Sequence, residues 1–214
     1  MLIRKPSSFE FLLGFLLLLL VGVPILDAAF YSDADADETT LVRRIAFAAI
    51  IVTAARVAWT HELRFGVVLF LGSAALLGDL VWNDPLVGVA DIGFFSYLAL
   101  AFMGYIFRQR RVTSNVVAAS LCVYILIGFL WAFFYLVLNE FEPSVSFRED
   151  DLSRRDLVYF SFVTLTTLGY GDITPLSPYS KAAAMVEAIV GQIYLIVIVA
   201  RLVAMSIMHE VKQN

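Results

Sequence analysis

Charged residues are scarce in this chain. Asp, Glu, Lys and Arg make up 16% of its 214 residues, whereas 61% are hydrophobic. Soluble domains average about 25% charged and about 45–50% apolar residues. The mean hydropathy of +0.85 therefore excludes an ordinary soluble domain and predicts an integral membrane protein. The net charge of −4 argues against nucleic acid as a partner.

Cysteine and histidine are also rare. Cys122 is the single cysteine, so no intrachain disulfide can form, and its position within an apolar run predicts a small buried side chain. His61 and His209 are the two histidines, and we expect surface positions for them rather than a proton-sensing role. The sequence contains no HExxH pattern, nucleophile elbow, phosphate-binding loop or metal-ligand cluster. We therefore expect neither an enzyme nor a resident cofactor.

Long apolar runs are abundant. A bilayer-spanning helix needs about 20 mostly apolar residues. Six runs are expected to cross: Phe9 to Leu26, Leu41 to Trp59, Phe65 to Trp82, Leu86 to Phe107, Val116 to Leu138, and Tyr179 to Met208. The expected fold class is an all-α integral membrane protein with six transmembrane helices. The first run also has features of a signal peptide, but we favour a retained helix.

The loop charges predict the orientation. Arg4, Lys5 and the basic cluster 108–111 are expected in the cytoplasm, opposite the acidic segment 27–40. The protein is then expected to cross a cell (plasma or inner) membrane several times, with both termini in the cytoplasm. Five arginines fall on the outer side and weaken this bias: Arg43, Arg44, Arg148, Arg154 and Arg155.

A shorter apolar segment, 156–167, lies between the fifth and sixth runs and is too short to cross. Ser153 and Asp156 before it are spaced as a helix-capping box. The segment leads into Thr-Leu-Thr-Thr-Leu-Gly-Tyr-Gly-Asp at 164–172. Glycine reaches backbone angles that other residues avoid. An alternation of such angles would align successive carbonyl oxygens, the ligands that hard cations prefer.

This stretch closely resembles the selectivity filter of the tetrameric potassium channels, usually Thr-Val-Gly-Tyr-Gly-Asp. The matching residues are Thr164, Thr167, Gly169, Tyr170, Gly171 and Asp172. Leu168 replaces the usual valine, and because only its carbonyl would face the ion, selectivity is expected to survive. The resemblance implies that Thr167, Leu168, Gly169, Tyr170 and Gly171 bind permeant K⁺. It also implies a re-entrant pore helix before the filter and a homotetramer around it.

Further residues are expected to support the filter. They are Thr164, Thr166, Tyr159, Asp172 and Glu187. We expect the Tyr159 hydroxyl to bond Asp172, and Glu187 to make a structural hydrogen bond behind the filter. Val163 stands where some relatives carry a carboxylate, so a filter held by fewer hydrogen bonds, and able to inactivate, is expected.

The last apolar run is expected to line the cavity below the filter. The residues concerned are Gly191, Gln192, Leu195 and Val199. Gly191 stands where relatives commonly carry a hinge glycine, and a glycine needed for helix packing is an equal alternative. Arg201 is expected to extend toward the inner lipid headgroups.

Voltage-gated channels share this six-span layout, but their fourth span carries regularly spaced arginines. Leu86 to Phe107 contains no Lys or Arg, and Asp91 is its only charge. We therefore expect residues 1–112 to form a four-helix transmembrane domain without a sensor. Residues 113–214 are expected to form the pore domain, with no cytoplasmic regulatory domain.

Buried charges in lipid are usually paired. Asp79 and Asp91 are therefore expected to form a fixed cluster with Arg43 and Arg44. Arg56 is expected to extend to the headgroups or to meet Glu62.

The expected function is passive, potassium-selective conduction by a homotetramer surrounded by membrane lipids, without steep voltage dependence. A non-selective monovalent cation channel is one alternative. A subunit of an ion uptake transporter is the other, although such systems carry four pore units in one chain with looser motifs.

Overall fold

The computed structural model describes residues 8–25, 36–60, 64–81, 86–141, 146–149 and 152–211. Its elements in chain order are α1 (Ser8–Leu17), the π-helical turn η1 (Leu18–Gly22), α3 (Ala36–Thr60), α4 (Phe65–Val81), α5 (Leu86–Arg108), α6 (Ser114–Phe141), α7 (Arg154–Leu165) and α8 (Pro178–Val211). Each expected apolar run is thus helical close to its predicted bounds. The expected pore helix, 156–167, begins and ends two residues earlier than predicted, as α7.

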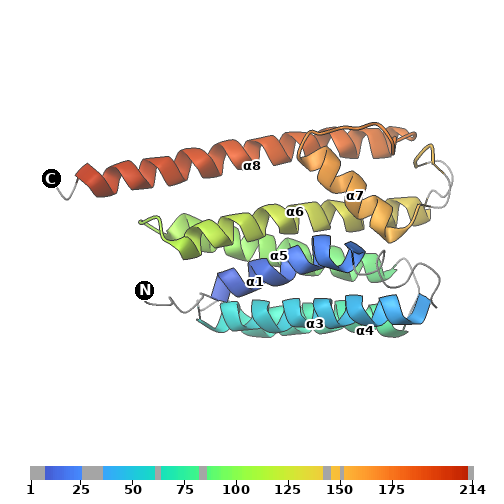
Figure 1. The fold of residues 1–214 in the computed structure, drawn as a ribbon, viewed down its shortest axis with the longest axis horizontal. Coiled ribbons are helices and arrows are strands. Elements are labelled where there is room, and N and C mark those ends of the chain that lie inside the picture. The colour runs from blue at the N-terminus through green and yellow to red at the C-terminus, as the bar shows by residue number, and fades with distance from the viewer. Residues whose placement is uncertain are drawn as a thin grey trace.

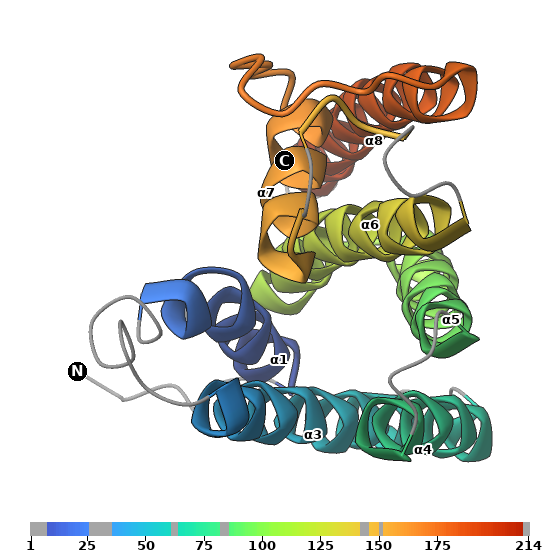
Figure 2. The same ribbon diagram turned by 90° about the vertical axis from the view of Figure 1, so that its right-hand side faces the viewer.

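The long helices lie side by side, with α8 along one side of the molecule and α3 and α4 along the other (Figure 1). Helix α6 lies between them and packs against α1, α5, α7 and α8. The end-on view shows α7 crossing obliquely beside α6 and α8 (Figure 2). This arrangement places the segment after α7 next to the first half of α8.

Three described helices are long and apolar enough to cross a membrane: Gly88–Arg108, Ser114–Phe141 and Pro178–Ile207. Two shorter apolar helices cover Phe9–Ile25 and Phe65–Gly78. Helix α3 meets neither description, because it carries charges near its start and at Arg56. The all-helical structure fits an integral membrane channel, whereas six crossings stay a prediction.

The core between α5, α6 and α1 is built from aromatic and branched side chains. On α5, residues three or four positions apart form one buried stripe: Phe94, Phe95, Leu98, Phe102 and Ile106. Such spacing places side chains on one face of a helix. Cys122 is fully buried in the same core, as predicted.

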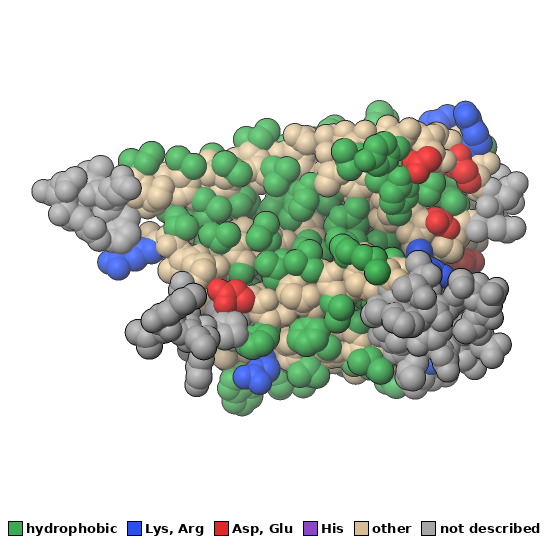
Figure 3. Space-filling model, in the orientation of Figure 1, with side chains coloured by type: hydrophobic (Ala, Val, Ile, Leu, Met, Phe, Trp, Pro, Cys, Tyr) green, Lys and Arg blue, Asp and Glu red, His purple; other side chains and the backbone are tan. Residues whose placement is uncertain are grey.

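Helix α8 buries only a narrow stripe of its surface against the rest of the chain. The other faces expose apolar side chains, among them Met185, Ile189, Ile193, Ile196, Val199 and Val203. On the face shown in Figure 3, hydrophobic side chains cover the middle of the molecule and charged ones gather toward its two ends. This distribution is typical of a protein surrounded by lipid.

Candidate selectivity filter and its supports

Helix α7 begins with the predicted capping box. The Ser153 hydroxyl oxygen accepts a hydrogen bond from the Asp156 backbone N–H at 3.3 Å. In return, the Asp156 carboxylate accepts one from the Ser153 N–H at 2.9 Å. Two backbone donors at the start of the helix are thereby satisfied, which confirms this sequence prediction.

The last turn of α7 holds the inner end of the candidate filter. The Val163 carbonyl accepts hydrogen bonds from the backbone N–H groups of Leu168 at 2.9 Å and Gly169 at 3.3 Å. The Thr167 N–H donates to the Thr164 carbonyl at 2.9 Å. The chain therefore turns back sharply at the end of the helix instead of continuing it.

The backbone beyond this turn alternates in handedness. Thr167, Gly169 and Gly171 have φ angles of 60°, 56° and 78°. Among the described residues, Thr167 is the one non-glycine with positive φ. A β-branched residue in that region is strained by roughly 1–3 kcal/mol, and such strain clusters at functional sites. The glycines were expected to alternate in this way, but the left-handed Thr167 was not foreseen.

The candidate filter is open to its surroundings in the single chain. Leu168 is 58% exposed and Tyr170 is 68% exposed. At its inner end, the Gln192 side-chain amide lies 3.5 Å from the Thr167 hydroxyl. Leu195 and Val199 are also exposed, three and seven residues further along α8. The three side chains expected at the cavity thus share one exposed side of α8, beginning at the filter.

The outer end is held by two carboxylates. The Tyr159 hydroxyl donates to Asp172 at 2.7 Å, the bond expected from the sequence, and this bond lowers the pKa of Asp172. The Glu149 carboxylate accepts from the Thr174 backbone N–H at 2.9 Å and from its hydroxyl at 3.2 Å. The backbone bond is the main cause of a lowered pKa at Glu149. Glu149 was not predicted, because its partner lies 25 residues away and forms no local motif.

Glu187 is fully buried behind the candidate filter, where α6, α7 and α8 meet. The Tyr135 hydroxyl lies 2.6 Å from one carboxyl oxygen, and the Ser161 hydroxyl lies 2.5 Å from the other. Sequence reasoning named Glu187 and a hydrogen bond behind the filter, but neither partner. In the sequence, Ser161 on α7 and Tyr135 on α6 lie 26 and 52 residues from Glu187.

Two glycines let neighbouring helices approach α7 closely. A Cβ at Gly191 would lie 2.5 Å from the Leu165 backbone carbonyl oxygen, and one at Gly128 would lie 2.5 Å from the Phe162 ring. This close approach fits the packing role, one of the two predicted for Gly191, and the hinge stays a prediction. The Thr166 hydroxyl closes the end of α7 by donating to the Phe162 carbonyl at 2.6 Å.

Arg201 lies against the end of α5. The Nη2 atom of its guanidinium, which has two hydrogens to donate, lies 3.2, 2.8 and 3.0 Å from the backbone carbonyl oxygens of Ile106, Phe107 and Gln109, at the C-terminal end of α5. It also lies over the Phe107 ring, 4.8 Å from the centroid. That it also extends toward the inner lipid headgroups stays a prediction. Carbonyls at a helix end lack partners within the helix and carry partial negative charge, so they bind the cation.

Comparison with known proteins adds to this geometry. Residues 119–207 match a family model described as an ion channel. That is an ion-channel signature. The matched region includes most of α6, all of α7, the candidate filter and most of α8, which are the elements that build the site.

The relatives found are mainly potassium channels. The chain is 30% identical over 109 residues to a two pore potassium channel a of Oryza sativa subsp. japonica, which covers 51% of this chain and 28% of that protein. It is 50% identical over 36 residues to a two-pore potassium channel 5 of Arabidopsis thaliana, covering 17% of this chain and 9% of that protein. Protein LctB of Bacillus caldotenax is 41% identical over 83 residues, covering 36% of this chain and 61% of that protein.

The chain thus spans less than two thirds of the length of each relative. No solved structure matches it. The family match supports an ion channel, and the apolar helices support a membrane location.

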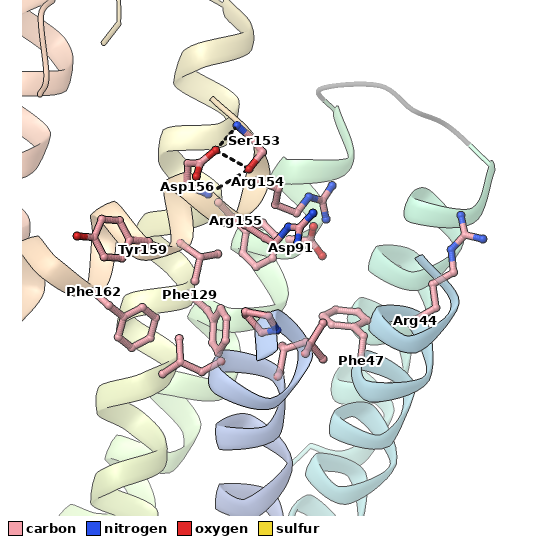
Figure 4. A pocket seen from close by; sticks show the side chains of 16 residues that line it. Arg44, Phe47, Asp91, Phe129, Ser153, Arg154, Arg155, Asp156, Tyr159 and Phe162 are labelled. Atoms are coloured by element: carbon pink, nitrogen blue, oxygen red, sulfur yellow. Dashed lines mark hydrogen bonds between the residues drawn. The ribbon is translucent and has the colours of Figure 1, made fainter. Parts of the chain in front are cut away.

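A pocket of about 640 Å³ lies between the N-terminal helices and α7, beside the ion-channel region. Asp91, 3% exposed, lines it together with Arg44, Arg154 and Arg155. Figure 4 shows Arg154 and Arg155 directed toward Asp91 and Arg44 directed away from it. The arginines that approach Asp91 therefore come from α7, whereas the sequence suggested those at the start of α3. The side chains of Arg43, Asp79 and Glu62 lie outside the described residues.

Proposed function

We propose that the chain forms a potassium-selective channel for passive conduction. The observation that carries this proposal is the alternation of left-handed residues at Thr167, Gly169 and Gly171. With every second residue left-handed, successive carbonyls turn to one side of the chain. Carbonyl oxygens from 167–171 would then replace the hydration shell of K⁺ at little cost.

A homotetramer is part of the proposal. One chain supplies one side of a filter, and Leu168 and Tyr170 project from it without cover. The apolar faces of α8 are similarly open. Four copies around an axis would cover these surfaces and close the ring of carbonyls. The C-terminal ends of four α7 helices, which carry partial negative charge, would face the cavity where a cation waits.

In this proposal residues 113–214 form the pore and residues 1–112 surround it in contact with lipid. The chain crosses a cell (plasma or inner) membrane six times, with both termini in the cytoplasm. Steep voltage dependence is not expected. Moving one charge through 100 mV supplies about 2.3 kcal/mol, and α5 carries no Lys or Arg before its last residue, Arg108.

The direct test is flux through purified protein in liposomes under opposed K⁺ and Na⁺ gradients. We expect a reversal potential near that of K⁺, and a particle mass of four chains. Gly169→Ala should abolish selective flux, because the substituted residue strongly disfavours the left-handed φ of 56°. Gly104→Ala is the matched control, because a Cβ there meets nothing within 4 Å and its φ is not left-handed.

The alternatives give different results in the same assay. A non-selective channel would reverse near zero under opposed gradients. A transporter would show potassium flux that depends on a second ion. Monomeric protein, or liposomes impermeable to K⁺ under every condition, would refute the proposal.

A further inference from the structure

A short chain of polar groups connects the three helices of the candidate pore. The Tyr135 hydroxyl of α6 lies 2.6 Å from one Glu187 carboxyl oxygen. The Ser161 hydroxyl of α7 lies 2.5 Å from the other carboxyl oxygen and 2.8 Å from the Gly128 backbone carbonyl of α6. Every contact is made within one chain and away from solvent.

Counting hydrogens limits how this chain can be bonded. A serine hydroxyl has one proton to donate and two lone pairs to accept with. A carbonyl oxygen cannot donate, so Ser161 must give its proton to Gly128 for that 2.8 Å contact to be a hydrogen bond. The 2.5 Å contact to Glu187 then needs a proton from Glu187 itself. Both contacts are satisfied together only when the carboxyl group is protonated.

The charges around Glu187 favour the same state. On α6 the titratable groups that face it are the phenols of Tyr135 and Tyr124. Ser161 faces it from α7. The nearest ionisable residue toward the start of that helix is Tyr159, whose hydroxyl bonds Asp172, and the nearest charged one is Asp156. On α8 the nearest cation in the sequence is Lys181, six residues and more than a turn away. Among the described residues the carboxyl group makes no ion pair, and a fully buried carboxylate without a cation is costly.

We propose that Glu187 is a proton-binding site in the pore. The bound proton sits on the Glu187 carboxyl oxygen that faces Ser161 and is donated to the Ser161 hydroxyl. The Ser161 hydroxyl in turn donates its own proton to the Gly128 carbonyl. The Tyr135 hydroxyl donates to the other carboxyl oxygen of Glu187. The effect of this proton on the filter, described next, rests on the proposed function as a channel. Whether Glu187 holds a proton is independent of conduction.

Loss of this proton would change the connection between α6 and α7. At alkaline pH a hydroxide or buffer base takes the proton, and Ser161 turns its own proton from Gly128 toward the carboxylate. The Gly128 carbonyl then loses its bond to α7. Two residues beyond Ser161, the Val163 carbonyl holds the N–H groups of Leu168 and Gly169. We therefore expect alkalinisation to loosen the inner end of the filter and to reduce conduction.

The experiment combines infrared titration with potassium currents, both on the full chain reconstituted in lipid. The infrared signal of a protonated carboxylic acid should be present at neutral pH, absent from Glu187→Gln, and lost in the alkaline range where the current falls. Glu187→Gln should conduct at neutral pH and lose the alkaline fall, because the amide donates to Ser161 and accepts from Tyr135 without titrating. Glu140→Gln, at an exposed position on α6, is the matched control and should keep the wild-type alkaline profile.

Tyr135→Phe provides a second variant if Glu187→Gln fails to fold. A hydrogen bond to a charged acceptor is the stronger one, so removing this donor should move the loss of the proton, and the fall in current, to higher pH.

An ionised Glu187 at neutral pH would overturn the proton site even if the protein conducts K⁺. An alkaline fall in current that is unchanged in both Glu187→Gln and Tyr135→Phe would overturn the proposed link between this proton and the filter. If the infrared titration behaves as expected but no K⁺ flux is found, the proposed channel function fails and the proton site stands.

Discussion

Replacing Gly191 by alanine tests how closely α8 packs against α7. The new Cβ would lie 2.5 Å from the Leu165 carbonyl oxygen and 2.9 Å from the Leu165 Cδ1 atom. Ordinary contact begins at 3.4 Å, so the helices must separate by about 1 Å. The carbonyl belongs to the backbone of α7 and cannot turn away as a side chain can.

The expected cost follows from two opposing effects. Overpacking of this kind destabilises by about 1–3 kcal/mol. Alanine regains about 1 kcal/mol because it favours the helix more than glycine does. We therefore expect a net loss of up to roughly 2 kcal/mol in the free energy of unfolding. Conduction should also change, because Leu165 ends the helix that leads into the candidate filter.

Two further glycines calibrate the measurement. At Gly128 the obstacle is the edge of the Phe162 ring at 2.5 Å, which can tilt, so Gly128→Ala should cost less. At Gly104 nothing lies within 4 Å, so Gly104→Ala should be neutral or stabilising. Denaturant unfolding of the three reconstituted variants, read by intrinsic fluorescence, should rank Gly191, Gly128 and Gly104 in decreasing cost.

Equal stability of Gly191→Ala and Gly104→Ala would refute the packing argument. If Gly191→Ala then changed only the open probability of the channel, the hinge role would be favoured instead.

Three other perturbations have defined outcomes. Tyr159→Phe removes the bond to Asp172 and should speed the decay of current during sustained opening; an unchanged decay would remove the role given to this bond. Arg201→Ala should weaken the contact between α5 and α8 by roughly 1–2 kcal/mol in unfolding assays. Arg201→Lys should restore only part of it, because the ammonium group loses the contact of the guanidinium plane with the Phe107 ring, and full restoration would contradict a need for the guanidinium. Glu149 has a lowered pKa, so its bonds to Thr174 should persist at neutral pH and weaken only as outer pH falls through that lowered value; Glu149→Gln should remove this acid sensitivity of the current.

Local pattern was enough to predict much of the candidate pore region. The bilayer-length apolar runs, the capping box at Ser153 and the filter glycines depend on residues close together in the chain. Each of these signals reflects a property of the backbone or of a single helix. The Tyr159–Asp172 bond, 13 residues apart, was also foreseen, because it belongs to the same short pore helix and filter segment.

Only the tertiary structure decided the polar contacts between helices that are distant in the sequence. Glu187 contacts Ser161 and Tyr135, and Arg201 binds the carbonyls at the end of α5. Asp91 faces arginines of α7 (Figure 4). No local spacing marks these partners, because they depend on how the helices are rotated and where they cross. The sequence by itself determined which segments are helical and which backbone conformations the glycines of the candidate filter allow. Only the packing of the helices determined which buried polar group meets which partner. The physical reason is that each buried polar group must form its hydrogen bonds with the groups that the neighbouring helix presents.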